Sequence, residues 1–333
     1  RDVACAVYFI NVQHINKMGK RIGFLINEIA DPDNLRLAFW KARKGKEDKP
    51  EVIEFRKQLD ANLLSLRYDL LSGSVEVGNY HYFTIYDPKE RVICAAPFRQ
   101  RVFHHAIMNI CHPIFEKFQI FDSYATRLNK GQYAALERAK YYSANHQWFC
   151  KMDVRKYFDS IDHEVLYAKL KSKFKDPYLL DLFHKIIKSY ETAPDKGLPI
   201  GNLTSQYFAN FYLGFADHFI KEKLQVSAYV RYMDDMVFWS NDKETLLTIV
   251  KQFNVFISST LKMTLKPYCI NRLEKGLPFL GYVIFKDTVR LNKTSKKRFT
   301  RKMNLYYSNL ENESWSQTQY ARHVLPLIAF TRH

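Results

Sequence analysis

The sequence predicts a mixed α+β fold of two or three subdomains, because helical and strand patterns alternate along a chain with ample apolar content. The chain has 333 residues, of which 47% are hydrophobic, so it can bury a substantial core. Apolar residues recur at three- and four-residue spacing in several segments, a pattern typical of amphipathic helices. Between these segments lie short runs rich in aromatic and β-branched residues, which indicate β-hairpins.

The charge balance points to a polyanionic partner. The formal net charge is +17, from 51 Lys and Arg against 34 Asp and Glu. No apolar run approaches the ~20 residues needed to span a bilayer, so nucleic acid is favoured over a membrane. The five scattered cysteines never pair at Cys-x-x-Cys spacing, which predicts neither a zinc site nor a disulfide framework and suits a reducing, cytoplasmic setting.

The first part of the chain is predicted to be mainly helical. We expect helices over residues 24–44, from Phe55 to a stop at Gly73, and from Pro97 to Pro113. Such a helical region would supply a framework for the strand segments that interrupt it.

Residues 80–96 predict a hairpin with its turn at Asp87 and Pro88. Lys89 and Arg91 lie beside this turn. Ammonium and guanidinium groups pair well with phosphate oxygens, so the hairpin could grip a triphosphate. Two solvated surface charges on a hairpin are an equally good interpretation of these two residues alone.

A strand is predicted at residues 148–153, ending in the carboxylate of Asp153. A loop carrying Phe158 follows, and Asp162 is expected to cap the next helix. A single acid at a strand end is more often a cap or turn residue than a catalyst. A catalytic role for Asp153 is therefore inferred only if a second functional residue accompanies it.

The second half continues the alternation. A Gly/Pro loop at 197–202 leads through 204–206 into an apolar helix, and a short strand is expected at 263–266. Residues 279–282 begin a further hairpin, and the chain becomes strongly basic after Lys286. Basic residues with aromatic neighbours suit a phosphate backbone and its bases.

Residues 229–239 form the segment around which the other motifs are arranged. They predict a hairpin with Asp234 and Asp235 at its turn. Two carboxylates held together repel each other, and a divalent cation makes the arrangement tolerable. An ordinary Asp-Asp surface turn is the alternative for the dipeptide taken alone.

The order of these motifs resembles that of the reverse transcriptases. Residues 232–235 match the Tyr-x-Asp-Asp signature of that family, and Asp153 followed five residues later by Phe158 matches its first catalytic segment. The later Lys266 and the Phe-Leu-Gly at 279–281 follow in the family's order. The resemblance covers roughly residues 91–282.

Residues 200–206 narrow the resemblance. Most reverse transcriptases have Gln in place of Ile200 and Pro in place of Gln206, whereas this loop is similar to that of diversity-generating retroelement enzymes. Residues 122–131 and 42–46 also resemble that group, part of a bacterial and phage superfamily with retron and group II intron enzymes.

The resemblance implies a right-hand polymerase fold with fingers, a palm made of an antiparallel sheet backed by helices, and a short helical thumb. Residues 18–147 would be mainly fingers, 148–285 mainly palm and 286–333 the nucleic-acid-binding thumb. Residues 1–17 are expected to be an extension or an artificially added segment ahead of Met18.

The resemblance also implies the site residues and cofactors. Two Mg²⁺ ions, with Mn²⁺ as a substitute, would be held by carboxylates and one backbone carbonyl, consistent with hard oxygen ligands. The implied catalytic residues are Asp153, Asp234, Asp235 and Lys266, the metal ligands Asp153, Val154, Asp234 and Asp235, and the substrate-binding residues Lys89, Arg91, Phe158, Ile200 and Gln206.

The implied activity is RNA-directed DNA synthesis that copies a template-repeat RNA into adenine-mutagenised cDNA. Its partners would be template RNA, a primer or cDNA strand, dNTPs and a small basic pentameric accessory protein. Two alternatives remain open: another bacterial reverse transcriptase, such as a phage-defence enzyme, and a catalytically inactive nucleic-acid-binding relative.

Overall fold

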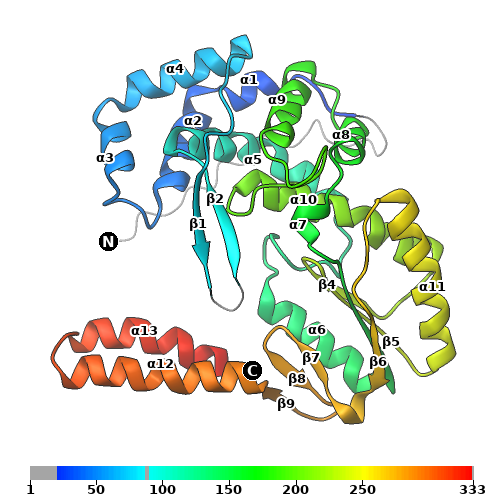
Figure 1. The fold of residues 1–333 in the computed structure, drawn as a ribbon. Coiled ribbons are helices and arrows are strands. Elements are labelled where there is room, and N and C mark those ends of the chain that lie inside the picture. The colour runs from blue at the N-terminus through cyan, green and yellow to red at the C-terminus, as the bar shows by residue number, and fades with distance from the viewer. Residues whose placement is uncertain (1–20, 87–89, 332–333) are drawn as a thin grey trace.

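The structure is a computed structural model that describes residues 21–86 and 90–331, and Figure 1 shows its arrangement of helices and strands. The helical elements are α1 (Leu25–Ile29), α2 (Pro32–Arg43), α3 (Pro50–Lys57), α4 (Leu59–Ser72), α5 (Phe98–Phe118), α6 (Gln132–Asn145), α7 (Tyr157–Ser160), α8 (His163–Lys171), α9 (Pro177–Lys188), α10 (Leu203–His218), η2 (Phe219–Lys223), α11 (Lys243–Thr260), η3 (Leu273–Lys275), α12 (Lys293–Glu311) and α13 (Gln317–Thr331). The strands are β1 (His81–Ile85), β2 (Arg91–Ala95), β3 (Trp148–Asp153), β4 (Tyr229–Tyr232), β5 (Asp235–Ser240), β6 (Cys269–Arg272), β7 (Leu277–Phe279), β8 (Tyr282–Ile284) and β9 (Val289–Leu291). The predicted α+β class is confirmed.

A four-stranded antiparallel sheet is the centre of the molecule. Its strand order is β4-β5-β3-β6, and its neighbours pair antiparallel throughout. The side chains of a strand alternate between two faces, so one strand can serve two different cores. Cys150 and Met152 join the core shared with α10 and α11, whereas Phe149 joins the core shared with α6.

Figure 1 shows the sheet between α11 and α6, with β7, β8 and β9 beside α6. Both faces are therefore covered, and the strands are apolar along most of their length. Three charged residues, Lys151, Asp153 and Asp235, share the α6 face at the end of β3 and the start of β5. Polar residues at one end of an otherwise buried face identify that end as the place to examine for chemistry.

The helices near the N-terminus pack around α5. Asp31 caps α2 by accepting hydrogen bonds from the backbone N–H groups of Asp33 and Asn34, and Pro32 occupies the first turn. The rings of Phe39 and Phe55 stack with centroids 5.8 Å apart in this core. In Figure 1 the β1–β2 hairpin extends from this helical layer in the direction of α12 and α13.

The structure corrects three predicted boundaries. α5 continues through Pro113 to Phe118, because the buried Cys111 and Phe115 on either side pack into the core and offset the hydrogen bond that proline removes. The helix expected from Phe55 to Gly73 is divided into α3 and α4 at Gln58, whose φ is −120°. Residues 263–266 form only a single bridge at Leu265 instead of a strand.

The last two helices, α12 and α13, run side by side away from the sheet in Figure 1. α12 has no buried residue, and its first turns carry several basic side chains. Within residues 21–86 and 90–331, no helix is both long and apolar enough to cross a bilayer.

Candidate active site

Two of the predicted catalytic acids lie opposite each other in the central sheet. Asp153, the last residue of β3, pairs in register with Asp235, the first residue of β5. The two-residue turn of the β4–β5 hairpin consists of Met233 and Asp234, because Tyr232 already pairs with Asp235. The prediction that both acids occupy the turn is therefore half correct: Asp234 lies in it, whereas Asp235 starts the strand.

The environment of these carboxyl groups disfavours their charged forms. Burial, and then the neighbouring Asp153, raises the pKa of Asp234. Burial raises the pKa of Asp235 to about 6, although the ammonium group of Lys151 acts in the opposite direction. Asp153 Oδ1 and Asp235 Oδ1 are buried and have no hydrogen-bond partner among the described residues.

Two lysines balance part of this negative charge. Lys151 Nζ donates to Asp235 Oδ2 at 2.9 Å and to the Pro278 carbonyl at 2.8 Å. Lys266 Nζ donates to Asp153 Oδ2 at 2.8 Å, and its backbone N–H donates to the Asp153 carbonyl at the same distance. Lys151 was not predicted, although its position two residues before Asp153 places both on one face of the strand.

The carboxylates fit a hard divalent cation. Each of Asp153 and Asp235 presents one oxygen to a lysine and leaves the other without a partner, and unpaired carboxylate oxygens are what Mg²⁺ or Mn²⁺ coordinates. Val154, the predicted backbone ligand, lies next to Asp153 and forms an isolated antiparallel bridge with Leu265.

A buried arginine supports the Asp234 turn. Arg231 is fully buried, and its guanidinium donates to both carboxylate oxygens of Asp217, to Asn210 Oδ1 and to Ser123 Oγ. Its Nη1 also donates to the Met233 carbonyl at 3.0 Å. Met233 has a φ of 53°, a conformation that is uncommon for a residue other than glycine. The guanidinium thus holds the strained residue immediately before Asp234.

Sequence patterns did not identify Arg231 as a functional residue. Its side-chain partners lie 14 to 112 residues away along the chain, so no neighbouring side chain marks this basic residue inside an apolar strand. The one feature of the sequence that could have identified Arg231 is its positive charge in a segment of residues otherwise suited to burial.

A backbone hydrogen bond positions Ile200, one of the predicted substrate-binding residues. The Ile200 carbonyl accepts from the backbone N–H of Cys94 on β2 at 2.7 Å, so this loop is attached to the hairpin that carries Arg91. Gly201 follows with a φ of +119°, and a Cβ there would lie 2.8 Å from Ile93 Cγ2. Only glycine suits such a close approach at that φ.

Phe158 lies in the one-turn helix α7 instead of the predicted loop, and its carbonyl accepts from the Leu198 N–H at 2.9 Å. Gln206 lies in the first turn of α10 and is half-buried. Arg91 is exposed at the start of β2, whereas Lys89 and the predicted turn at Asp87 and Pro88 lie outside the described residues.

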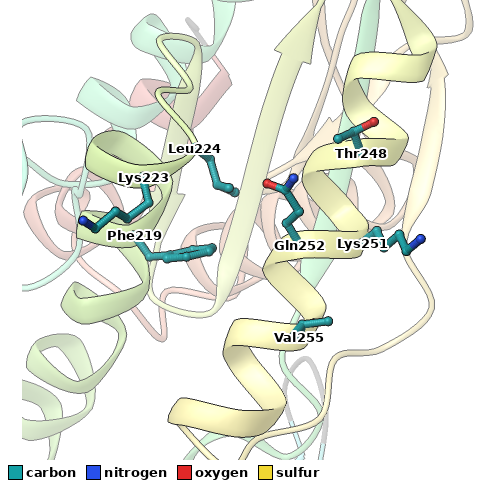
Figure 2. A pocket seen from close by; sticks show the side chains of 7 residues that line it. All are labelled: Phe219, Lys223, Leu224, Thr248, Lys251, Gln252 and Val255. Atoms are coloured by element: carbon teal, nitrogen blue, oxygen red, sulfur yellow. The ribbon is translucent and has the colours of Figure 1, made fainter.

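A surface hollow lies between η2 and α11, and Figure 2 shows the side chains that line it. They are Phe219, Lys223, Leu224, Thr248, Lys251, Gln252 and Val255. None of the predicted site residues is among them. The acids at the ends of β3 and β5 therefore mark the candidate active site independently of this hollow.

Relatives with a similar sequence come from bacteria and from fungi. Protein YkfC of Escherichia coli K12 is 24% identical over 197 residues, which are 55% of this chain and 51% of YkfC. The COX1/OXI3 intron 1 protein of Saccharomyces cerevisiae is 24% identical over 135 residues, 38% of this chain and 16% of that protein. The chain thus spans at most about half the length of these relatives.

A solved structure shares the fold. Apo telomerase from Candida tropicalis superposes with a TM-score of 0.50 at 13% identity, covering 76% of this chain and 57% of the telomerase chain. This likeness supports a polymerase fold of mixed helices and sheets.

The sequence model described as reverse transcriptase (RNA-dependent DNA polymerase) matches residues 87–284, more than half of the 333 residues. The match contains the paired strands β3 and β5 with all three acids of the candidate site. On this match the chain belongs to the reverse transcriptase (RNA-dependent DNA polymerase) family.

Proposed function

We propose that the protein is an RNA-directed DNA polymerase whose active site is formed by Asp153, Asp234 and Asp235. The observation that carries this proposal is the convergence of the three acids at one end of the central sheet, with unpaired oxygens on two of them. Family membership makes nucleotidyl transfer to a primer the corresponding reaction.

The proposed division of the chain follows the right hand of polymerases. Residues 18–147 would form mainly the fingers, 148–285 the palm and 286–333 the thumb. The central antiparallel sheet between helices suits a palm, and the exposed basic face of α12 suits contact with a nucleic-acid backbone.

The acids would hold two Mg²⁺ ions, together with the Val154 carbonyl, and Mn²⁺ could replace them. Bound at this position, such a pair would supply charge that stabilises both the attacking and the leaving oxygen of an in-line phosphoryl displacement. The raised pKa of Asp234 and of Asp235, caused mainly by burial, supports this proposal, because it means that the protein disfavours their negative charges. Divalent cations would supply the missing positive charge.

Protein side chains would contribute positioning and a proton. Arg91, with Lys89, would bind the triphosphate, and Phe158 would pack against the sugar and exclude a 2′-hydroxyl group. Lys266 would donate a proton to the leaving pyrophosphate, because its ammonium group already lies 2.8 Å from a carboxylate of the site.

Within the family, we propose a diversity-generating retroelement enzyme that copies a template-repeat RNA with errors at adenines. The support is the segment from Ile200 to Gln206, whose first residue is apolar where most reverse transcriptases have an amide. A small basic pentameric accessory protein would be the partner of such an enzyme. A phage-defence reverse transcriptase, which can polymerise without a template, and an inactive nucleic-acid-binding relative are the outcomes that the next experiment separates.

The test is primer extension by the full chain on a set of RNA templates that differ only in the first template nucleotide. Mg²⁺ and one dNTP at a time are supplied. We expect incorporation of the complementary dNTP on each template, with errors enriched opposite adenine. Addition that ignores the template nucleotide would favour the defence-type alternative, and absence of any extension would favour the inactive relative.

Replacing Ile200 with Gln should lower misincorporation opposite template adenine by about fivefold, since one added hydrogen bond is worth roughly 1 kcal/mol. The half-buried Ile200 lies in a backbone attached to β2, so the new amide would act at a fixed position. The measurement is the error spectrum of cDNA sequenced from one template. Ile200→Leu, which stays apolar, is the matched control, and identical spectra for Ile200→Gln and wild type would reject the role.

A further inference from the structure

A second group of potential metal ligands lies at the start of α8, apart from the carboxylates of β3 and β5. It consists of His163, Glu191 and Asp195, which we call the His163 cluster. One ligand atom from each residue can be chosen so that all three atoms lie within 4.8 Å of one another. Glu191 and Asp195 belong to the loop that follows α9 and leads into the Gly/Pro loop at 197–202.

The hydrogen bond of His163 determines which ring nitrogen can bind a ligand. Nε2 lies 2.7 Å from the Gly197 carbonyl, which can only accept a hydrogen bond, so Nε2 carries the proton. In the neutral ring Nδ1 then has a free lone pair. This nitrogen is buried in a residue only 1% exposed and has no hydrogen-bond partner among the described residues. The Nδ1 lone pair is therefore available to coordinate a metal ion.

The carboxylates of Glu191 and Asp195 lie close to the His163 ring. Glu191 Oε1 lies 4.0 Å from His163 Nδ1, too far for a hydrogen bond and close enough for both atoms to bind one ion after a small movement. Ligands at metal distances of about 2.1 Å in a tetrahedral site lie about 3.4 Å from one another. The side chains of Glu191 and Asp195 are 46% and 60% exposed, so burial does not prevent them from closing this gap.

Backbone contacts hold the cluster together. The His163 N–H donates to the Asp195 carbonyl, and the Gly197 N–H donates to the Ile161 carbonyl, each at 2.9 Å. An isolated antiparallel bridge joins Asp162 and Lys196 between them. The loop and the start of α8 are thus positioned before any ion binds, which lowers the ordering cost of binding.

We propose that the His163 cluster binds a divalent transition-metal ion of the Zn²⁺ class, with water completing its coordination. An imidazole nitrogen with two carboxylates suits Zn²⁺, whereas the all-oxygen site at Asp153 suits Mg²⁺. A metal-binding histidine usually donates its other ring N–H to an acceptor that fixes the ring, and the Gly197 carbonyl already accepts from His163 Nε2 in this way. The ion would stabilise the loop that precedes Ile200, and the proposal does not depend on polymerase activity.

Lys188 is the natural competitor of the ion. Its ammonium group forms an ion pair with Asp195 and lies 3.6 Å from Glu164. Metal binding would displace this ammonium from the Asp195 carboxylate. Removing it should therefore tighten the site.

The test is a titration of the metal-free full chain with Co²⁺, followed by visible absorption and by displacement with Zn²⁺. Beside any ion held by the acids of β3 and β5, we expect one Co²⁺ site per chain that persists in Asp234→Asn. Its affinity should weaken at least about tenfold in Glu191→Gln and in Asp195→Asn, and tighten several-fold in Lys188→Met. X-ray absorption of the Zn²⁺ form should show one imidazole ligand. Both weakened variants alter exposed side chains, so loss of folding does not confound the result.

Asp181→Asn is the matched control, since Asp181 is an exposed acid of α9 that pairs with Lys185 outside the cluster. The Co²⁺ affinity of Asp181→Asn should stay within about twofold of that of wild type. The proposal is overturned if the Glu191→Gln/Asp195→Asn double variant binds Zn²⁺ as tightly as wild type, or if the bound ion has no imidazole ligand. Because these readouts need no nucleotide, failed primer extension would leave them interpretable.

Discussion

Asp234→Asn should reduce primer extension by about 10³-fold or more, while the metal-free protein becomes as stable as wild type or more stable. The loss of activity follows because a metal ligand contributes several kcal/mol to the transition state, and each 1.36 kcal/mol is tenfold in rate. The gain in stability follows because burial and Asp153 already disfavour the Asp234 carboxylate. Single-turnover extension and urea unfolding in EDTA measure the two effects.

The pH dependence of this stability gain has a definite sign. A carboxyl group whose folded-state pKa is raised contributes most favourably when protonated, below its unfolded pKa, and this contribution is lost as pH rises through the folded value. The Asn substitution should therefore change stability little near pH 4 and stabilise the metal-free protein at pH 8. A variant that is inactive only because it has unfolded would show the opposite change in stability.

Arg231→Met should destabilise the protein by about 3–5 kcal/mol, because the fully buried Asp217 would be left without its cationic partner. Primer extension measured on the folded fraction should also fall, by about 10- to 100-fold, since the Met233 carbonyl would lose its donor and the Asp234 turn its support. Urea unfolding and extension at matched folded concentration separate the two consequences.

The double variant Arg231→Met/Asp217→Asn tests this separation. An amide at position 217 removes the uncompensated charge and still accepts from the Tyr229 hydroxyl, so much of the stability should return. Activity should stay low, because nothing restores the contact to Met233. Full recovery of activity along with stability would show that Arg231 contributes only to folding.

Sequence patterns predicted the parts of the fold that are governed by local rules. Asp162 caps α8 as short-range capping chemistry dictates, and Gly73 ends α4 with a φ of 73°. The order of the acids, loop and lysine also indicated the family that the comparisons confirm. Each of these signals is contained within a few neighbouring residues or in their order along the chain.

The incorrect predictions concern helix ends and strand starts that are determined by residues distant in the sequence. Pro113 would end an isolated helix, yet α5 continues because packing on both sides of the proline dominates. Likewise, the placement of Asp235 in a strand follows from its pairing with Asp153, 82 residues earlier in the chain. Strand register is decided by the partner strand, which local patterns do not reveal.

In the candidate active site, too, some residues could be predicted from the sequence and others could not. Asp153, Asp234 and Lys266 could be selected from motif order, whereas Lys151 and Arg231 act through contacts that exist only after folding. Arg231 in particular is held in place by hydrogen bonds to Asp217 and Asn210 on α10. A charged residue within an apolar strand is a useful warning that such a buried partner exists.

The most direct test of the proposed active site is single-nucleotide incorporation on an RNA template by wild type and Asp153→Asn, each metal-loaded and measured at equal folded concentration. We predict template-directed incorporation by wild type and a rate about 10³-fold lower for Asp153→Asn. Equal rates for the two proteins would contradict the assignment of the paired acids of β3 and β5 as the catalytic centre.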